Sequence, residues 1–350
     1  MKATSHPSQA RDLEGDARPG ATQVDISPFI GRLGGSGTGC LSRDTANEEL
    51  LKALPDAAPL MSLSDQFALR PFLTLGLWKA AVIEGVGSLM LVWVTVFANG
   101  SPLVLPSAPT ERWGVFNNAT FVGPLVGGVL NFFYISLFIF CFGGVTGAHL
   151  NPAITIATLF ARLCSLPRAV LYVGFQTGGA AVGGLLARVA RGSREFKTGG
   201  CWLFSDIVPV QDAFAIEFMA CLIMLFFAFG TGLDPRQRET VGPTLGPFLV
   251  GLSVAGLTFG TGFARYGYGG AGLNPARCFG AYVGSHFPGF HWIHWYTPPM
   301  MASAYQRWLT YTGWPTSQLA RFTLAFTIWR RRGKVGCSSP TVFLVLPILK

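Results

Sequence analysis

Long runs of apolar residues, separated by short polar segments, dominate the chain from about residue 77 onward. A helix needs about 20 predominantly apolar residues to cross a lipid bilayer. Five runs approach or exceed that length, at residues 77–98, 122–145, 169–187, 213–233 and 241–264. The second and the fifth contain no charged residue. This pattern predicts an all-α polytopic membrane protein.

Two nearly identical motifs lie between these runs. Gly147-Ala148-His149-Leu150-Asn151-Pro152-Ala153 and Gly270-Ala271-Gly272-Leu273-Asn274-Pro275-Ala276 are offset by 123 positions. Each Asn-Pro-Ala is a strong helix start, because Asn caps helix N-termini well and Pro is favoured at the first helical position. The run after each motif is only about eight to twelve residues, roughly half of a bilayer crossing. We therefore expect two re-entrant half-helices.

The motifs indicate an internal duplication. The first repeat covers about residues 77–187 and the second about 213–295, and each begins with a span that contains a Glu. Three spans per repeat is an odd number, so the second repeat inserts upside down relative to the first. The two half-helices then meet, N-terminus to N-terminus, at the bilayer midplane.

The two ends of the chain differ from this central domain of residues 71–295. Residues 1–70 are polar and rich in Gly, Pro, Ser and Asp, which predicts a disordered cytoplasmic arm. Residues 296–350 do not supply a convincing sixth span, because the stretch 318–329 is short and contains Arg321. Two explanations for the missing sixth span stay open, namely a degenerate C-terminal segment and an out-of-frame gene model. Both termini are cytoplasmic if six spans form.

The composition supports a membrane protein and excludes several other classes. Half of the residues are apolar and 12% are charged, against about 25% in soluble domains. The net charge of +9 is spread over termini and loops without a basic stripe, so a nucleic-acid partner is not expected. The seven cysteines form neither a disulfide framework nor a metal-ligand spacing. Cys278 is interpreted as a small apolar packing residue, and no cofactor or metal is expected.

The midplane is the candidate site. Two helix N-termini there place two partial positive charges beside any path, which repels cations and protons. The side-chain amides of Asn151 and Asn274 can act as fixed donors to a passing solute. Irregular backbone at membrane depth is tolerated where it lines a cavity, so a pore-lining role is expected for Gly147, His149, Gly270 and Gly272. Arg277 would add a charged constriction.

Glu84 and Glu217 need an explanation, because an acidic group inside a span costs about 2.5–3.5 kcal/mol on insertion scales. One interpretation is a proton relay. The other is a structural brace whose carboxylate accepts N–H bonds from the re-entrant loops, and the matched positions in the two repeats favour it. Gln176 is likewise interpreted as a brace. The residues form no plausible catalytic arrangement, so an enzyme is not expected.

The paired motifs, the Glu-bearing span ahead of each and the Arg after the second resemble the aquaporin, or major intrinsic protein, family over about residues 77–295. Arg277-Cys278 resembles the signature of the X intrinsic proteins, a subfamily of fungi and plants. The resemblance implies a homotetramer of right-handed six-helix bundles in the lipid bilayer, with one pore per protomer. It implies a central constriction at Asn151-Pro152-Ala153 and Asn274-Pro275-Ala276, and an outer filter at Arg277.

The resemblance also places the other filter positions, by spacing from the motifs, at Asn131, Thr258 and Ala271. Water-selective members usually carry a Phe and a His there, so these residues imply a wider, polar filter. The expected function is a passive channel in the plasma membrane for small neutral solutes such as glycerol, urea and hydrogen peroxide, with water a weaker permeant. Two alternatives stay open, namely a non-conducting protein without a sixth helix and a proton-coupled transporter or membrane enzyme that uses Glu84 and Glu217.

Overall fold

The computed structural model describes residues 28–33, 41–59, 61–99, 118–234 and 238–297. The long helices are α3 (Leu75–Ala98), α4 (Asn118–Gly143), α6 (Leu166–Arg191), α7 (Val210–Ala228, continued by the π-helical turn η4, Phe229–Leu233) and α8 (Arg238–Thr261). Among the described residues, five helical segments are long and apolar enough to cross a membrane. The five spans predicted from the sequence are confirmed.

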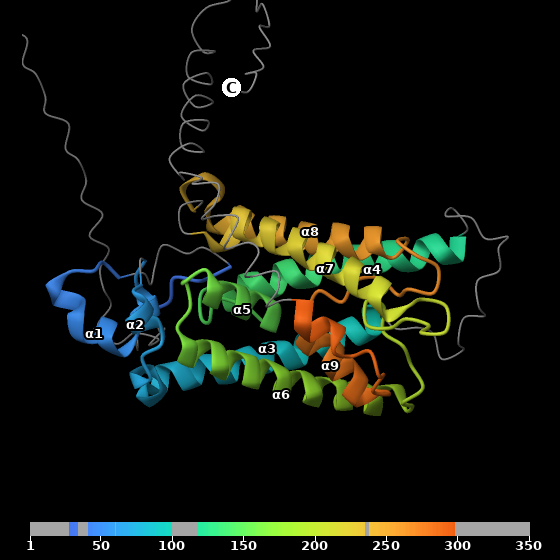
Figure 1. Ribbon diagram of the computed structural model, residues 1–350, viewed down its shortest axis with the longest axis horizontal. Helices are drawn as coiled ribbons and strands as arrows, with labels where there is room; N and C mark the ends of the chain where they lie inside the picture. Colours follow the sequence, from blue (N-terminus) through green and yellow to red (C-terminus); the bar gives the residue numbers. More distant parts are fainter. Residues whose placement is uncertain (1–27, 34–40, 60, 100–117, 235–237, 298–350) are drawn as a thin grey trace, which may run out of the picture.

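These helices form two layers around two shorter ones. Helix α3 packs along α6, and α4 packs along α8. The half-helices α5 (Pro152–Phe160) and α9 (Pro275–Gly284) lie between the layers (Figure 1). The largest cluster of buried apolar side chains lies around α5, α7 and α8, and includes Ile154, Met224 and Val250. The fold thus buries both half-helices in protein and keeps them out of lipid.

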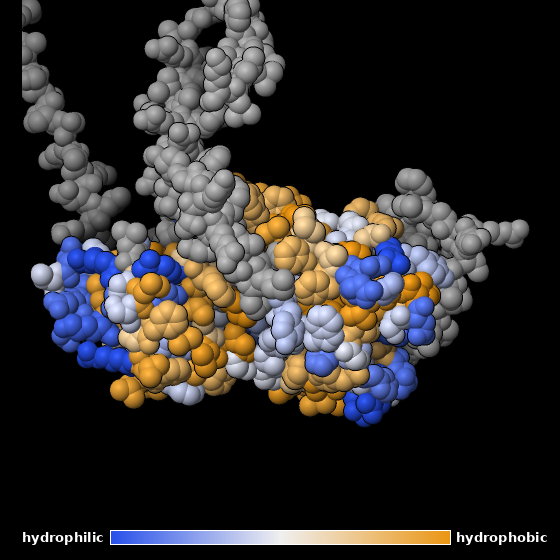
Figure 2. All heavy atoms as spheres, viewed as in Figure 1, coloured by the Kyte–Doolittle hydropathy of each residue, from blue (hydrophilic) through white to orange (hydrophobic). Residues whose placement is uncertain are grey.

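Helix α3 shows how one span serves both lipid and protein. The side chains of Val82, Val86, Met90, Trp93 and Phe97 recur every three or four residues and are exposed on its outer face. The opposite face is buried and carries polar groups. Figure 2 shows hydrophobic residues over much of the surface between two more hydrophilic ends. An apolar surface of this kind suits a bilayer, and it leaves polar groups only where protein can satisfy them.

Helix α6 approaches its neighbours at the distance of backbone contact. A Cβ added at Gly179 would lie 1.9 Å from the carbonyl oxygen of Gly85 in α3. One added at Gly184 would lie 1.7 Å from the carbonyl oxygen of Gly280 in α9. Small residues let membrane helices pack this closely. The glycines of α6 therefore fix the position of the second half-helix.

Both half-helices begin as the sequence predicts. The side-chain oxygen of Asn151 accepts a hydrogen bond from the Ala153 N–H at 2.9 Å. That of Asn274 accepts one from the Arg277 N–H at 3.1 Å. Each proline occupies the first helical position, where its missing N–H leaves nothing unpaired.

The N-terminal region differs from the expected disordered arm. Residues 28–33 pack against the membrane domain, and short helices follow at η1 (Thr45–Asn47), α1 (Glu48–Ala53), η2 (Pro55–Ala57), α2 (Leu63–Gln66) and η3 (Arg70–Leu73). The physical reason is a buried ion pair. Asp56 accepts from Arg168 Nε at 2.9 Å and Nη2 at 3.0 Å, and both side chains are 1% exposed. Ser165 Oγ donates to the same carboxylate at 2.6 Å.

The sixth span cannot be compared, because residues 298–350 lie outside the described part of the chain. The described part ends in a turn of residues 289–292 and a helical segment of residues 293–297, where Ile293 and His294 are buried.

Gly184→Ala should destabilise the fold, because the new methyl group meets a backbone oxygen that cannot rotate away. Overpacking of this kind costs about 1–3 kcal/mol. The matched control is Gly178→Ala, six positions earlier in α6, where a Cβ meets nothing within 4 Å. The control should unfold at the same temperature as the parent or slightly higher, since Ala favours helix more than Gly. Thermal unfolding of the detergent-solubilised protein measures both, and equal midpoints would contradict the prediction.

Acid should release the N-terminal region. Burial by itself raises the pKa of the Asp56 carboxyl, but the Arg168 guanidinium and the Ser165 donors lower it, and the net pKa lies below its ordinary value. Such a group stabilises the folded state above its unfolded pKa of about 3.9 and loses that effect as pH falls through the folded pKa. Proteolytic protection of residues 41–70 should therefore be constant from about pH 7 to 5 and should fall below about pH 4.

Asp56→Asn should loosen the same region at neutral pH, because it leaves Arg168 buried without a counter-charge, which costs about 3–5 kcal/mol. The control is Glu49→Gln, which removes an exposed ion pair with Lys52 in α1. Equal rates of limited proteolysis in the two variants would show that the buried pair does not anchor this region.

Candidate functional site

The two Asn-Pro-Ala motifs are joined by a reciprocal pair of hydrogen bonds. Asn151 Nδ2 donates to the carbonyl of Leu273 at 2.9 Å, and Asn274 Nδ2 donates to that of Leu150 at 2.9 Å. The half-helices therefore meet N-terminus to N-terminus. Each amide caps its own helix with its oxygen and holds the opposite loop with one N–H. A primary amide has two N–H donors, so one donor on each Asn is left for a solute.

Both loops are held from behind by a buried carboxylate. Glu84 accepts from the backbone N–H of His149 at 3.1 Å and that of Leu150 at 2.6 Å, and from Gln176 Nε2 at 2.9 Å. Glu217 accepts from the Gly272 N–H at 2.9 Å and from the Tyr268 hydroxyl at 3.0 Å.

These contacts are the ones expected of a brace. Both acids are 0–1% exposed, and neither is among the described residues that line the cavity beside the motifs. The arrangement does not favour a proton relay, because a relay needs a path to water.

A narrow cavity of about 60 Å³ passes the two motifs. Its polar lining comes from Thr95, Asn131, His149, Asn151, Thr258, Asn274 and Arg277. Most of its remaining wall is apolar, from residues such as Ile135, Phe138 and Val254. A few polar groups on an otherwise apolar wall offer a solute hydrogen-bond partners at only a few points along the cavity.

Three of the predicted filter positions, Asn131, Thr258 and Arg277, line the cavity, and the first two are in contact. Asn131 Nδ2 lies 3.4 Å from Thr258 Oγ1, and Asn131 also pairs with the amide of Asn99 at 3.4 Å. Ala271 is buried, and its N–H donates to Thr261 Oγ1 at 2.9 Å. The next two residues, Gly272 and Leu273, line the cavity, and the filter role of Ala271 stays a prediction.

The remaining loop residues have different environments. Gly147 and Gly270 adopt φ of 97° and 92°, which side chains disfavour. Gly147 packs against Phe29, and neither glycine is among the described lining residues. His149 lines the cavity, and its ring contacts the carbonyl of Gly31 at 2.7 Å. Among the described residues no cluster of His, Cys, Asp and Glu is arranged to hold a metal.

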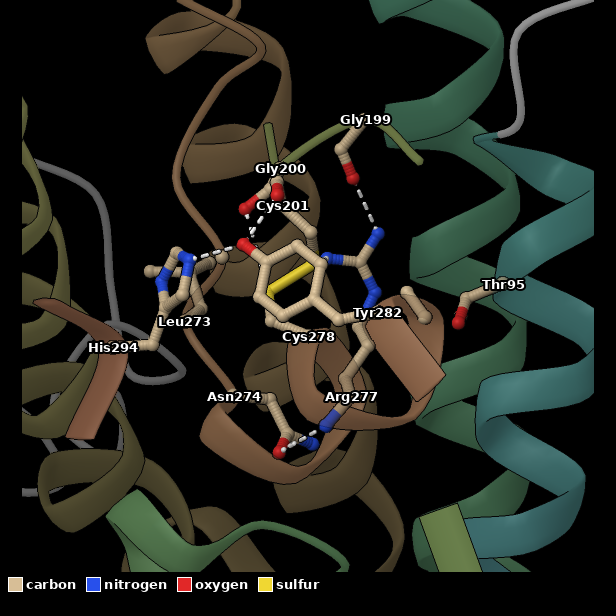
Figure 3. Close-up of a disulfide and its surroundings, with 12 residues drawn as sticks. Thr95, Gly199, Gly200, Cys201, Leu273, Asn274, Arg277, Cys278, Tyr282 and His294 are labelled. Carbon is tan, nitrogen blue, oxygen red and sulfur yellow. Dashed lines mark hydrogen bonds between the residues drawn. A yellow bond between two sulfur atoms is a disulfide. The ribbon is translucent and has the colours of Figure 1, made fainter. Parts of the chain in front are cut away.

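Arg277 is held by a loop between α6 and α7. Its Nη2 donates to the carbonyl of Gly199 at 2.6 Å, and its Nη1 lies 3.3 Å from Cys201 Sγ (Figure 3). Cys201 forms a disulfide with Cys278, with a Cα–Cα separation of 5.1 Å. The interpretation of Cys278 as an unpaired packing residue is wrong. The two cysteines are 77 positions apart, and no local spacing in the sequence indicates that they pair.

Sequence reasoning also missed a residue at the other end of the cavity. Leu33 lines it, 3% exposed, and packs in the same apolar cluster as Met224 and Val250. The Leu33 N–H donates to the carbonyl of Gly147 at 2.9 Å. The N-terminal segment thus forms part of the cavity wall. No motif in residues 1–70 indicates this, because the contact depends on how the chain folds back.

The described helices, the paired half-helices and the cavity between them define an integral membrane protein of the channel type. Residues 71–306 match the family model described as Major intrinsic protein, which is two thirds of the chain, and the protein belongs to that family. Its members are membrane channels for water and small solutes and are not enzymes.

Curated relatives agree with this assignment. "Probable aquaporin PIP2-7" of Oryza sativa subsp. japonica is 31% identical over 267 residues, which is 72% of this chain and 84% of the relative. "Aquaporin PIP2-1" of Arabidopsis thaliana is 30% identical over 232 residues, or 63% and 76% of the two chains. The aquaglyceroporin from Plasmodium falciparum superposes with a TM-score of 0.48 at 19% identity, covering 66% of this chain and 95% of that one.

Glu84→Gln should prevent stable folding. The amide offers one acceptor oxygen where the carboxylate offers two, and its NH₂ would face the backbone N–H groups of the loop. Leaving buried donors unpaired costs about 1–3 kcal/mol each. We expect loss of the monodisperse peak in size-exclusion chromatography, whereas Asp212→Asn, at a half-exposed ion pair, should retain it. A folded Glu84→Gln protein that conducts solute but has lost a pH dependence would instead support a proton relay.

Proposed function

We propose that this protein is a passive channel for small uncharged solutes, namely glycerol, urea and hydrogen peroxide, with water a weaker permeant. The observation that carries the proposal is the polar group of Asn131, Thr258 and Arg277 at one end of the cavity. Amide, hydroxyl and guanidinium groups together offer donors and acceptors to a polyol or to urea. An aromatic ring at the position of Asn131 would close that space to all but water.

Ions and protons are excluded by the fixed charges of the same site. Each half-helix contributes roughly half a positive charge at its N-terminus. Among the described residues, Arg277 has no carboxylate within ion-pair distance. The positive field along the cavity is therefore not neutralised at the filter, and cations are repelled there.

Four further proposals concern the context of the channel. Arg277-Cys278 and the filter residues favour the X intrinsic protein subfamily. The exposed apolar faces of the spans suit a homotetramer in a bilayer, and the relatives named above favour the plasma membrane. Residues 71–295 would be the channel domain. The runner-up function is a non-conducting membrane protein, and the observation behind it is the absence of a convincing apolar span in the sequence of residues 296–350.

Flux measurements test the proposal. The full-length protein in proteoliposomes should pass glycerol, urea and hydrogen peroxide faster than empty vesicles do, with no proton leak. Vesicles that swell in a water gradient but stay tight to the other three solutes would overturn the assigned solutes. Vesicles tight to every solute would favour the non-conducting alternative.

Asn131→Phe should narrow the filter. We expect glycerol flux to fall by about tenfold or more, which corresponds to about 1.4 kcal/mol of added barrier, while water flux changes less. The matched control is Val129→Phe, which puts the same ring on the exposed face of the same helix. Stopped-flow light scattering measures both rates. A proportional loss of water and glycerol flux would indicate misfolding or a pore that does not pass this residue.

A further inference from the structure

The position of the filter arginine depends on one loop. In the described residues the guanidinium of Arg277 has two contacts, the carbonyl of Gly199 at 2.6 Å and Cys201 Sγ at 3.3 Å. Its Nε is buried and has no hydrogen-bond partner. The side chain is 8% exposed and lines the cavity. The position of the loop at residues 199–201 therefore determines the position of the Arg277 guanidinium.

The loop is fastened directly over the turn that carries Arg277. The disulfide joins Cys201 to Cys278, the residue after Arg277 in the first turn of α9. Gly200 lies close to the guanidinium, because a Cβ atom added at this glycine would be 2.8 Å from Arg277 Nη1. Backbone bonds from the Gly199 N–H to Asn99 at 2.7 Å and from the Gly200 N–H to Gly269 at 2.6 Å hold the loop on its other side.

Hydrogen bonds also join the same loop to Tyr282 and His294, which lie beside the brace of the second motif. The Tyr282 hydroxyl donates to the carbonyl of Cys201 and pairs with His294 Nε2 at 2.9 Å (Figure 3). His294 Nδ1 lies 3.4 Å from Glu217. The disulfide is thus part of one assembly with the filter and with the carboxylate that holds Gly272.

The disulfide also borders a separate cavity of about 240 Å³. Cys201 lines this second cavity, together with Phe196, Trp202 and Phe290. Glu195 and His286 also line it, and their side chains are 72% and 56% exposed, so this cavity reaches the solvent. The two cavities share no lining residue. Cys201 is 1% exposed and Cys278 is fully buried, so Cys201 is the cysteine of the pair that borders the solvent-reaching cavity, on the side away from the pore.

We propose that the Cys201–Cys278 disulfide is a redox-dependent positioning element of the filter. The inference rests on the proposed channel function. While the disulfide is intact, the loop draws Arg277 to the pore wall through the Gly199 carbonyl. When it is reduced, only the backbone bonds at Gly199 and Gly200 and the Tyr282 hydrogen bond still hold the loop, its distance from Arg277 is no longer fixed, and the guanidinium extends into the lumen. A filter obstructed in this way slows a bulky solute more than it slows water.

The chemistry is thiol–disulfide exchange with a dithiol. One thiolate of the dithiol attacks Cys201 Sγ, the bond to Cys278 breaks, and Cys278 leaves as a thiolate. The N-terminal turn of α9 stabilises that leaving group. The second thiol of the reagent then displaces Cys201. The dithiol ends as a disulfide, and its two protons pass to the two cysteines.

The test compares glycerol and water permeability of full-length protein in proteoliposomes before and after dithiothreitol. We expect the ratio of glycerol to water permeability to fall several-fold on reduction and to recover on reoxidation, with maleimide labelling of Cys201 only in the reduced state. Cys201→Ala should show the lowered ratio from the start and no response. Cys221→Ala, at a buried free cysteine in α7, should respond like the parent.

Arg277→Ala separates this role from a merely stabilising one. Without the guanidinium, reduction should leave the permeability ratio unchanged. If dithiothreitol lowers both permeabilities of the parent in proportion, or leaves Cys201 unlabelled, the inference is overturned and the channel function stands. If the oxidised parent passes no solute at all, the proposed function and the inference fall together.

Discussion

The reciprocal amide bonds of Asn151 and Asn274 set the condition that the rest of the structure must meet. Backbone that turns back at the centre of a membrane has no water to satisfy it, so every N–H and carbonyl there needs a partner in the protein. Each amide satisfies one helix N-terminus and one carbonyl of the opposite loop. The loop N–H groups remain, and the two buried carboxylates accept them. An acid inside a span is thus required by the geometry of the turn.

The two loops before the Asn-Pro-Ala motifs are held by different neighbouring segments, so the cavity has different linings beside the two loops. The first loop is fastened to the N-terminal segment, where His149 contacts the Gly31 carbonyl and Leu33 closes the wall. The second loop is fastened through Glu217 and Tyr268, and the extramembrane loop beside it brings the disulfide. The cavity is consequently lined by Leu33 and His149 beside the first loop and by the Arg277 guanidinium beside the second.

The sequence predicted those structural features that depend on an internal repeat or on a local periodicity of residues. The spans follow from hydropathy, the half-helix starts from Asn-Pro, and the contacts of Glu84 and Glu217 from their matched places in the two repeats. It did not predict the Asp56–Arg168 ion pair, the Cys201–Cys278 disulfide or the contact of Leu33 with the cavity. Each of these contacts joins residues that are far apart in the chain, and no spacing in the sequence indicates that such residues are in contact. The filter role of Ala271 stays a prediction.

The placement of Glu217 relative to Arg277 follows from the same reasoning. A carboxylate beside the guanidinium would hold it firmly, but it would also cancel the positive charge that, on the proposed function, repels cations. In this chain Glu217 lies behind the loop, where it accepts the Gly272 N–H, and Arg277 is held by a neutral carbonyl and a sulfur atom. Neutral acceptors keep the positive field intact, and they also bind the side chain less tightly than an ion pair does. A filter that needs its charge uncompensated therefore needs another constraint on its position, and a covalent bond next to Arg277 supplies one.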